Sequence, residues 1–505
     1  MPWIVRATPY DPLIPGETSL YFSDIGLMTR PTDAVPDTYY EKRLNAPFQV
    51  RTALYSGSYI GGRSDASFGS IRLANNDGGL DHLANYDWDG RLIEVSWTPT
   101  PNPVLPDFSV VFSGTAERLV LGDTIEIELR DLQVLLDKPY QIAKYLGTGS
   151  AEDGGQEGPP SYKDRRKPRL VGVCRNFQPV PIHFKKFIFQ YNNGPVGSVL
   201  AVRDGGYALT AGADHPNYAA LLAATVDAGT YATCRAEGLI RIGTAPGVLT
   251  MDAEGAAPSG YALLRFADIA QWVIDTDTDI SAGDFAAGAI ASMNALCPQV
   301  VGYWFDGSGG ENVRGVIDFL AQSIGAYYGF NDSRKIVFGR LDAPTGTAAF
   351  SFTDADFLSL RPLPVARRLK SQNIKFRRHW RPLSDSEVVG TITGAAKTDF
   401  TRQWREVTRT DAATAAASLL AREEKMESAL DAEADAIAEA DRRIALFGPR
   451  RRAFAGTVPF TPGLTAGVEV RLQSSRHGLS DGSNFIVVMA DRDSVTETHD
   501  IEVWG

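Results

Sequence analysis

Alternating apolar and polar positions predict that the first part of the chain is built from β-strands. The clearest runs are GRLIEVSW (90–97), FSVVFSGTAERLVL (108–121) and TIEIELRD (124–131), and Gly, Pro and Asp turns join them. A period of two places one face of a strand against a core and the other toward solvent. The pattern therefore predicts an N-terminal β-domain over residues 1–146.

The next two segments differ in composition. Residues 147–168 contain no large aliphatic side chain and mix Gly, Pro and charged residues, which is typical of a linker or a surface loop. Short β-like runs then resume, among them KFIFQYN, GTYATCRA and GLIRIGTA. We expect a small β-rich domain over residues 169–261.

Near residue 262 the apolar period changes to that of a helix. LLRFADIAQWVI, AGDFAAGAIASMNALC and ENVRGVIDFLAQSIGAYYGF have the pattern of amphipathic helices, and NDSRKIVFGRL adds a turn and a short strand. This combination predicts a small α/β domain over residues 262–345.

Residues 346–505 return to a β pattern, interrupted by one long helix predicted over residues 411–447. Ala, Leu, Glu and Arg dominate there, Thr410 is a suitable N-cap, and Gly448-Pro449 ends the pattern. The larger apolar residues fall on one stripe, which indicates a packing face: Leu419, Met426, Leu430, Ile437 and Ile444. The chain as a whole is therefore expected to be mixed, mainly β and multidomain.

A faint internal repeat relates the first domain to the last. Three short strands recur in the same order with similar spacing: Ile93–Val95, Phe108–Val111 and Ile125–Ile127, then Val468–Val470, Phe485–Val488 and Ile501–Val503. Two unrelated β-meanders could share this spacing, so coincidence and two copies of one β-domain both remain open.

Composition narrows the class of protein. At 505 residues the chain exceeds the roughly 250–300 residues that one core can serve, so several domains are expected. The formal charge of −11 disfavours a protein that grips duplex DNA, because such proteins carry basic patches. An acidic wall past which DNA slides would fit this charge.

Cysteine usage and hydropathy give two more expectations. Cys174, Cys234 and Cys297 are far apart in the sequence and favour buried free thiols in a protein made in a reducing cytoplasm. No apolar run approaches the ~20 residues that span a membrane, and the N-terminus lacks the pattern of a secretory signal.

The stretch NNDGGLDHLANYDWDG (75–90) is the strongest candidate for a metal site. Asn85, Asp87, Asp89 and Gly90 match the first half of a calcium loop, but Ser96 stands where the bidentate Glu should be. The favoured interpretation is that these Asn, Asp and Gly residues form a turn between two strands. Asp275, Asp277 and Asp279 also alternate, but Ile280 occupies the position where such a loop needs Gly. We expect no metal and no cofactor.

Signs of catalysis are weak. Asp87 and Asp89 flank Trp88 and could serve a glycosidase, which would need aromatic residues exposed beside acids in a groove; Trp88, Trp97, Trp304 and Tyr327 are the candidates. The chain lacks HExxH, GxxxxGK[ST] and GxGxxG motifs. We therefore predict that the protein is not an enzyme.

Arg450, Arg451 and Arg452 form a basic run directly after the predicted helix. A solvated turn is the simpler interpretation. The more specific interpretation is that these arginines form salt bridges with another subunit.

With these residues in view, the chain resembles the tail-tip or baseplate hub proteins of long-tailed, siphovirus-like bacteriophages and gene-transfer particles. The first block that carries the resemblance runs from Tyr40 and Arg43 to a W-x-G-R strand start at Trp88–Arg91. Two further blocks follow in family order, at residues 170–209 and from Leu446-Phe447-Gly448 to the closing EVWG. The family motif between the first two strands corresponds to a structural turn at Asn75, Asp77, Gly78, Asp81, Trp88 and Gly90.

The resemblance implies a homotrimeric hub that joins the tail tube to the tip and forms the channel for genome ejection. Each subunit would contribute two tail-tube-like β-barrel domains, 1–146 and 346–505, so that three subunits form a ring of six. The implied partners are the distal tail or tube protein, the tape-measure protein and a tip or fibre protein, and DNA would pass without specific binding. The implied location is the virion, with assembly in the host cytoplasm.

Two features set the chain apart within that family, and two alternatives stay open. Dispersed cysteines and the lack of a peptidase signature argue against the iron–sulfur site or wall-degrading domain that some members carry. The alternatives are a carbohydrate-binding or glycan-cleaving tail component and the spike base of a contractile secretion system.

Overall fold

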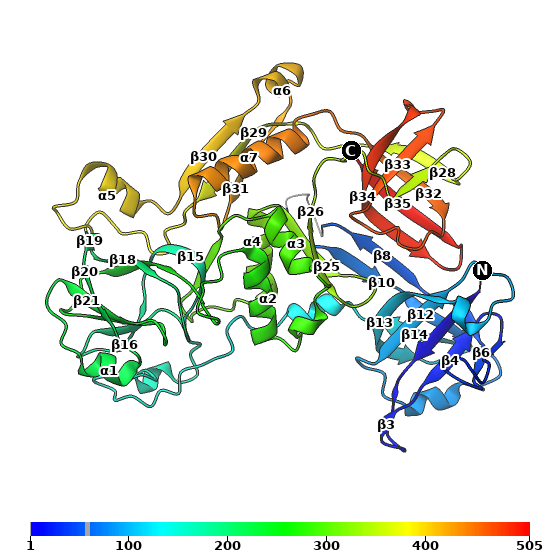
Figure 1. Ribbon diagram of the computed structural model, residues 1–505, viewed down its shortest axis with the longest axis horizontal. Helices are drawn as coiled ribbons and strands as arrows, with labels where there is room; N and C mark the ends of the chain where they lie inside the picture. Colours follow the sequence, from blue (N-terminus) through cyan, green and yellow to red (C-terminus); the bar gives the residue numbers. More distant parts are fainter. Residues whose placement is uncertain (1, 56–60) are drawn as a thin grey trace.

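The computed structural model describes residues 2–55 and 61–505, with Ser67 described by its backbone alone. Strands hold 40% of the residues and helices 17%. The strands form several separate sheets along an elongated molecule (Figure 1). The predicted mainly β, multidomain architecture is confirmed.

The first sheet is built from the N-terminal part of the chain. Across the sheet its strands are β5 (Leu27–Met28), β6 (Tyr39–Lys42), β4 (Leu20–Ser23), β1 (Trp3–Ala7), β12 (Leu92–Trp97), β13 (Ser109–Val120), β14 (Thr124–Leu129), β11 (Ser70–Ala74) and β7 (Leu44–Ala46). In β12 the buried residues are Ile93, Val95 and Trp97, alternating with half-buried ones. Because the observed burial follows the apolar alternation, the strands predicted between residues 90 and 131 are confirmed.

The second sheet lies beside the first and is built mainly from the C-terminal part (Figure 1). Across it run β10 (Asp65–Phe68), β8 (Gln49–Ala53), β34 (Leu479–Asp493), β35 (Thr498–Trp504), β32 (Ala453–Pro459) and β28 (Ser359–Leu363), while β33 (Glu469–Ser474) pairs with both β34 and β27 (Phe350–Phe352). Its core contains Phe454, Val470, Phe485 and Val503. β8 and β10 come from the N-terminal part of the chain, so the two sheets are joined by strand pairing.

A β-rich body follows the first sheet in sequence. One of its sheets contains β19 (Tyr207–Ala208), β18 (Val199–Asp204), β23 (Leu249–Glu254), β15 (Arg169–Phe177) and β24 (Gly302–Phe305). The other contains β16 (Val180–His183), β17 (Ile188–Gln190), β22 (Leu239–Ile242), β21 (Thr230–Cys234) and β20 (Thr210–Asp214), with α1 (Tyr218–Ala223) packed on β21. The preceding residues 147–168 form a loop with a 3-10 turn at Pro160–Tyr162, and that loop is tied down by backbone hydrogen bonds such as Gly147 to Glu157.

The middle of the molecule contains the helices predicted after residue 262, except that Ala326–Phe330, predicted as the end of the third helix, form a strand instead. They are α2 (Phe266–Asp277), α3 (Ala289–Leu296) and α4 (Val313–Ser323), next to β25 (Ala326–Phe330) and β26 (Ile336–Arg340). β25 also pairs with β9 (Gly62–Arg63) from the N-terminal part. Ile269, Val273, Ile317 and Leu320 belong to one buried cluster, as the amphipathic pattern predicts.

The predicted helix over 411–447 is wrong in its extent. The structure has α6 (Ala412–Ala417), then β31 (Arg422–Glu427), and only then α7 (Glu433–Phe447). β31 lies parallel to β29 (Leu369–Phe376), which also pairs with β30 (Arg405–Thr410), and a short helix α5 (Gly394–Thr401) precedes β30. Leu419, counted in the apolar stripe, is 89% exposed.

Two physical reasons explain this correction. β29 offers backbone partners to residues 422–427, and that tertiary pairing outweighs their helix propensity. Thr410 ends β30, and the side chain of Asp411 caps α6 instead, accepting from the Ala413 amide at 2.9 Å. A long helix near the C-terminus does exist as α7, which ends before Gly448 as expected.

Two further observations concern cysteines and membranes. Cys174, Cys234 and Cys297 are buried and free, as predicted, and burial raises the pKa of each thiol. Among the described residues, no helix is both long and apolar enough to cross a membrane.

Candidate assembly site

The first and second sheets repeat one order of strands. β12, β13, β14, β11 and β7 are successive neighbours in the first sheet, and β33, β34, β35, β32 and β28 are successive neighbours in the second. All these neighbours are antiparallel. This shared topology favours the interpretation that the internal repeat is two copies of one β-domain.

The residue alignment of that repeat needs one correction. Val95 lies opposite Phe112 in the first sheet, and Val470 lies opposite Phe485 in the second. Phe112, and not Phe108, therefore occupies the position of Phe485. A register shift between Val95 and Ser96 changes the length of the hairpin, and sequence spacing does not reveal such a shift.

A β-hairpin, here called the first arm (residues 44–53 and 65–74), connects the two sheets. Its base strands β7 and β11 pair in the first sheet, and its outer strands β8 and β10 pair with each other. β8 also pairs with β34, from Gln49 opposite Asp493 to Ala53 opposite Met489. The Leu54 amide then donates to the Val488 carbonyl at 2.9 Å. The first sheet thus extends the edge of the second.

Side chains reinforce this junction. Leu54 and Val488 are buried in one cluster that also contains Trp504. Phe460, from the second-sheet part of the chain, packs in the core of the first sheet, 5.0 Å from the Trp3 ring and 5.3 Å from the Trp97 ring. The two sheets therefore form one continuous body.

The predicted turn at residues 75–90 is held by side-chain hydrogen bonds. The Asn75 amide nitrogen donates to Asp81 at 2.8 Å and to the Gly122 carbonyl at 3.1 Å, and its oxygen accepts from the Leu80 amide at 2.8 Å. The Arg43 guanidinium donates to Asp77 at 2.7 Å and lowers the pKa of Asp77 to about 2.

Backbone conformation and burial account for the rest of this turn. Gly78 and Gly90 have φ of +68° and +72°, a region that favours glycine. Trp88 is buried, and its indole nitrogen donates to the Leu83 carbonyl at 3.0 Å. Each of these residues thus acts within the fold.

The metal candidates at this turn are held in different ways. The Asp89 carboxylate forms an ion pair with Arg130 at 2.5 Å, and the backbone of Asp87 exchanges hydrogen bonds with that of Tyr10. Asn85 ends the 3-10 helix Asp81–Asn85. Within residues 2–55 and 61–505, no group of three His, Cys, Asp or Glu side chains is arranged to hold a metal ion.

The alternating aspartates of residues 275–279 are also separated by their contacts. Asp277 is buried, pairs with Arg169 and accepts from the Gln141 amide at 2.8 Å. Asp275 accepts from the Ala282 amide, while Asp279 pairs with Lys138. These contacts stabilise the C-terminal end of α2.

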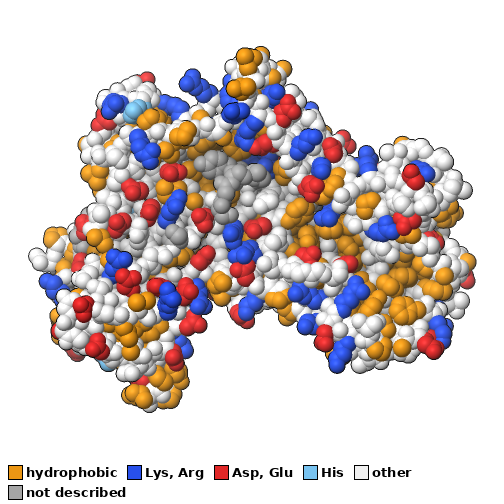
Figure 2. All heavy atoms as spheres, turned by 180° about the vertical axis from the view of Figure 1, so that it is seen from behind, with side chains coloured by type: hydrophobic (Ala, Val, Ile, Leu, Met, Phe, Trp, Pro, Cys, Tyr) orange, Lys and Arg blue, Asp and Glu red, His pale blue; other side chains and the backbone are white. Residues whose placement is uncertain are grey.

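Three of the four aromatic residues proposed for a glycan site are buried, and the fourth is half-buried. Trp88, Trp97 and Trp304 are buried, and Tyr327 is half-buried. Charged side chains of both signs are interspersed on the face shown in Figure 2. A stacking platform for sugars therefore has no support from these four residues.

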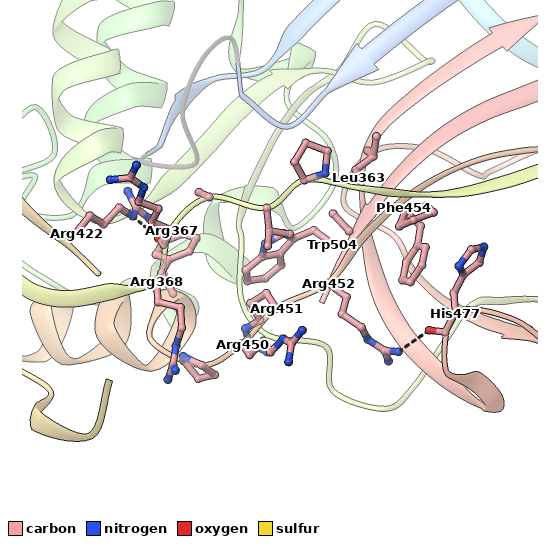
Figure 3. A pocket seen from close by; sticks show the side chains of 17 residues that line it. Leu363, Arg367, Arg368, Arg422, Arg450, Arg451, Arg452, Phe454, His477 and Trp504 are labelled. Atoms are coloured by element: carbon pink, nitrogen blue, oxygen red, sulfur yellow. Dashed lines mark hydrogen bonds between the residues drawn. The ribbon is translucent and has the colours of Figure 1, made fainter. Parts of the chain in front are cut away.

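The basic run lies at an open hollow of about 380 Å³ between the second sheet and the β29–β31 body (Figure 3). The Arg451 guanidinium lies 5.0 Å from the Trp504 ring and donates to the Leu446 carbonyl. Arg452 donates to the Gly478 carbonyl and to Ser483, and Arg450 is exposed. Arg367 and Arg368 line the same hollow (Figure 3).

Three of these basic side chains bond to uncharged oxygen atoms among the described residues. In the described part of the chain, none of the five arginines forms an ion pair with a carboxylate: Arg367, Arg368, Arg450, Arg451 and Arg452. Their hydrogen bonds go to carbonyl and hydroxyl oxygens instead. The hollow is therefore a concentrated positive surface on a protein that is acidic overall.

Sequence reasoning missed the first arm. Its signal is the run Gln49–Ala53, QVRTA, which alternates like a strand, but the partner strand is more than 400 residues away in sequence. Periodicity identifies a strand without identifying its partner.

Comparison with known proteins finds similarity to solved structures alone, at low sequence identity. No family model and no curated protein matches it. The tail protein of Neisseria meningitidis MC58 is similar over 100% of this chain and 96% of its own, with 10% identity and a TM-score of 0.41.

Two other solved structures show the same level of similarity. The 43 kDa tail protein of prophage MuSo2 from Shewanella oneidensis covers 92% of this chain and 94% of its own, with 11% identity and a TM-score of 0.37. A chain of the native gene transfer agent virion covers 72% of this chain and 86% of its own, with 15% identity and a TM-score of 0.37.

Proposed function

We propose that the protein is a structural component of a virion tail, a homotrimeric hub that joins the tail tube to the tip and surrounds the channel for genome ejection. The observation that carries this proposal is the repeated sheet. One chain contains two copies of a sheet with the same strand order, joined in series by the first arm. Three such chains bring six copies together, which matches the sixfold tube implied by the sequence resemblance.

Closed symmetry gives such a chain a role without catalysis. A head-to-tail contact between copies generates a ring when the rotation closes. The net charge of −11 suits a channel that DNA traverses without binding, since like charges disfavour adhesion. We therefore infer a non-enzymatic role in the virion, reached by assembly in the host cytoplasm.

The proposed partners follow from this position. A tube or distal tail protein would stack on one face of the ring, and a tip or fibre protein would bind the other. The tape-measure protein and the passing genome would occupy the channel. The exposed tip of the hairpin formed by β2 (Tyr10–Asp11) and β3 (Gly16–Glu17), with Leu13 81% and Ile14 78% exposed, is one surface available for such stacking.

The test is the native mass of the purified chain by light scattering across a dilution series, followed by imaging of the particles. The expected species has three times the chain mass of 54.7 kDa and forms rings. A chain that remains monomeric throughout the series would contradict the ring.

A further inference from the structure

The tip of the β29–β31 body carries an exposed apolar surface, here called the α6 cap (residues 412–420). α6 connects the ends of β30 and β31 and lies at one end of the molecule (Figure 1). Leu419 is 89% exposed and Leu420 is 70% exposed, and Figure 2 shows a hydrophobic patch at this end. Single surface leucines are common, whereas a contiguous apolar patch marks an interaction surface. Four alanines of α6 are exposed as well: Ala412, Ala413, Ala416 and Ala417.

The fold holds this cap in place from its inner side. Thr414 is buried within α6, and its hydroxyl donates to the Asp411 carboxylate at 2.6 Å. The Arg368 guanidinium donates to the Thr414 hydroxyl at 3.0 Å. Ala421, directly after the two leucines, is buried where β31 begins. The chain is thus anchored on both sides of the exposed leucines.

Arginines of the basic hollow adjoin the cap. Arg368 reaches Thr414 of α6 directly. Arg422 follows Leu420 by two residues, and its Nε donates to the Arg367 carbonyl at 2.9 Å. The hollow and the cap are therefore neighbouring parts of one surface.

Most of the positive charge on this surface has no counter-charge from its own chain. The Arg422 guanidinium is paired with the carboxylate two residues later. Arg368 and Arg451 bond to carbonyl oxygens at the end of α7, so the fold itself explains their positions. Arg367 and Arg450 are exposed, and no side-chain hydrogen bond or ion pair within the described chain accounts for them. These two guanidinium groups are available to an anion from outside.

A second exposed apolar tip lies at the opposite end of the molecule and has acids beside it (Figure 1). Leu13 and Ile14 of the β2–β3 hairpin are 81% and 78% exposed, much like the leucines of the α6 cap. The charged residues of that hairpin are Asp11 and Glu17, and Glu17 pairs with Arg91. The two tips therefore share their apolar character and differ in charge.

An apolar tip beside unpaired arginines matches the chemistry of an anionic lipid surface. Aliphatic side chains enter the boundary between headgroups and acyl chains, while guanidinium groups bind the headgroup phosphates. Neither signal alone gives firm attachment, but the two together do. A nucleic-acid strand would use the arginines and leave the leucines without a partner. The exposed leucines therefore favour a lipid surface.

We propose that the α6 cap inserts into the headgroup region of an anionic phospholipid membrane and that Arg367 and Arg450 bind its phosphates. The site lies within one chain, so the proposal is independent of the trimer. It adds a membrane-contacting end to the proposed hub, opposite the β2–β3 tip.

Flotation of the full-length chain with phospholipid vesicles tests this contact. Vesicles made of equal parts of phosphatidylcholine and phosphatidylglycerol should carry the chain upward in a density gradient. Vesicles of phosphatidylcholine alone should bind it at least about tenfold more weakly, because they lack net charge. Raising the ionic strength to ~0.5 M should remove most of this difference, since salt screens exposed charges.

Two matched double variants test the role of the leucines. Leu419→Gln with Leu420→Gln should lower the partition coefficient on the anionic vesicles by about tenfold or more, because the aliphatic contact is lost. Leu13→Gln with Ile14→Gln is the control at the equally exposed tip and should leave the partition coefficient unchanged. All four side chains are exposed, so circular dichroism should show the same fold in both variants.

Charge reversal tests the arginines in the same assay. Arg367→Glu with Arg450→Glu should lower the partition coefficient on the anionic vesicles by about tenfold or more. Arg30→Glu with Lys42→Glu removes two exposed cations of the first-sheet part and makes the same change in net charge. This control should bind as wild type does.

A fluorescent label reports insertion directly. An environment-sensitive dye attached to Leu420→Cys should brighten and shift to shorter wavelength on anionic vesicles. The same dye on Leu13→Cys should not respond. The native cysteines are buried and do not compete for the label.

The outcomes decide between a lipid surface and other partners. Loss of binding in the leucine and arginine variants, with both controls unchanged, supports the proposal. Binding that needs the arginines but not the leucines, and that single-stranded DNA displaces, overturns it and assigns the hollow to nucleic acid. A chain that does not bind anionic vesicles also overturns it, and the light-scattering test of the trimer is unaffected by that failure.

Discussion

The β34 edge and the β13 edge are the same position in two copies of one sheet, and they differ in chemistry. At β34 the added strand comes from the same chain, and its contact is a buried Leu54–Val488 pair. At β13 the residue at the equivalent register shift is the exposed Glu117. A strand edge that is covered during folding of its own chain can carry apolar side chains. An edge that stays exposed to solvent is protected from unwanted association by charged side chains.

The largest expected effect comes from weakening the junction between the two sheets. Leu54→Ala removes a buried side chain that is 2% exposed and should lower the free energy of unfolding by about 2–4 kcal/mol, since a cavity remains. Urea unfolding followed by circular dichroism measures this. Val365→Ala, at an exposed position before β29, is the control, and equal losses in the two variants would mean that burial at Leu54 adds no stability.

Lowering the pH should weaken the second sheet. His499 is buried beside Arg492, and burial lowers its pKa to about 3, while an unfolded histidine titrates near 6.5. The unfolded chain then binds the proton first, so stability is full above pH ~6.5 and falls as the pH drops toward 3.

Between pH 7 and 5 this loss should be about 2 kcal/mol, measured as the urea midpoint at each pH. The corresponding position of the first sheet is Ile125, which does not titrate, so the two sheets differ at this position. His499→Gln should flatten this part of the pH dependence. If the urea midpoint of that variant depends on pH as strongly as that of the wild type, a group other than His499 is responsible for the loss of stability.

A smaller loss of stability is expected from breaking the ion pair between Arg492 and Asp332, next to the pairing of β8 with β34. Arg492, opposite Val50 of the first arm, donates two hydrogen bonds to Asp332 at 2.7 and 2.6 Å. Asp332→Asn leaves a buried guanidinium without its counter-charge and should cost about 1–2 kcal/mol, reduced because Asp332 is partly exposed. Asp481→Asn on the exposed turn is the control. If it lowers the free energy of unfolding by the same amount, the Arg492–Asp332 ion pair has no specific stabilising role.

The smallest effects are expected at two exposed charged residues. Glu117→Ala and Arg367→Ala should each change the stability of the dilute monomer by no more than about 0.5 kcal/mol, because both side chains are exposed. Thermal unfolding at low concentration measures this. A loss well above that value in either variant would reveal a contact within the chain.

Short-range patterns predicted much of this molecule, and long-range pairing was beyond them. The meander strands, the helices α2 to α4 and the turn residues Asn75 and Gly90 follow from local periodicity and turn chemistry. The 411–447 helix was predicted too long because β29 recruits residues 422–427 as a strand. The first arm escaped prediction because nothing near Gln49–Ala53 indicates a partner at Met489–Asp493.

The candidate site was predicted in part. Arg450–Arg452 stand out as a basic run in the sequence, but their relation to Arg367 and to the hollow they share depends on the long-range pairing of β28 with β32. Glu117 carries no sequence signal at all. Its significance comes from a bulge in β13 that only the pairing with β14 reveals.

The position of Phe460 has a mechanical consequence. This ring, from the second-sheet part of the chain, is clamped between Trp3 and Trp97 in the core of the first, so the two halves of a subunit cannot hinge without exposing an aromatic core. Each subunit is therefore stiff across the junction of its two sheets.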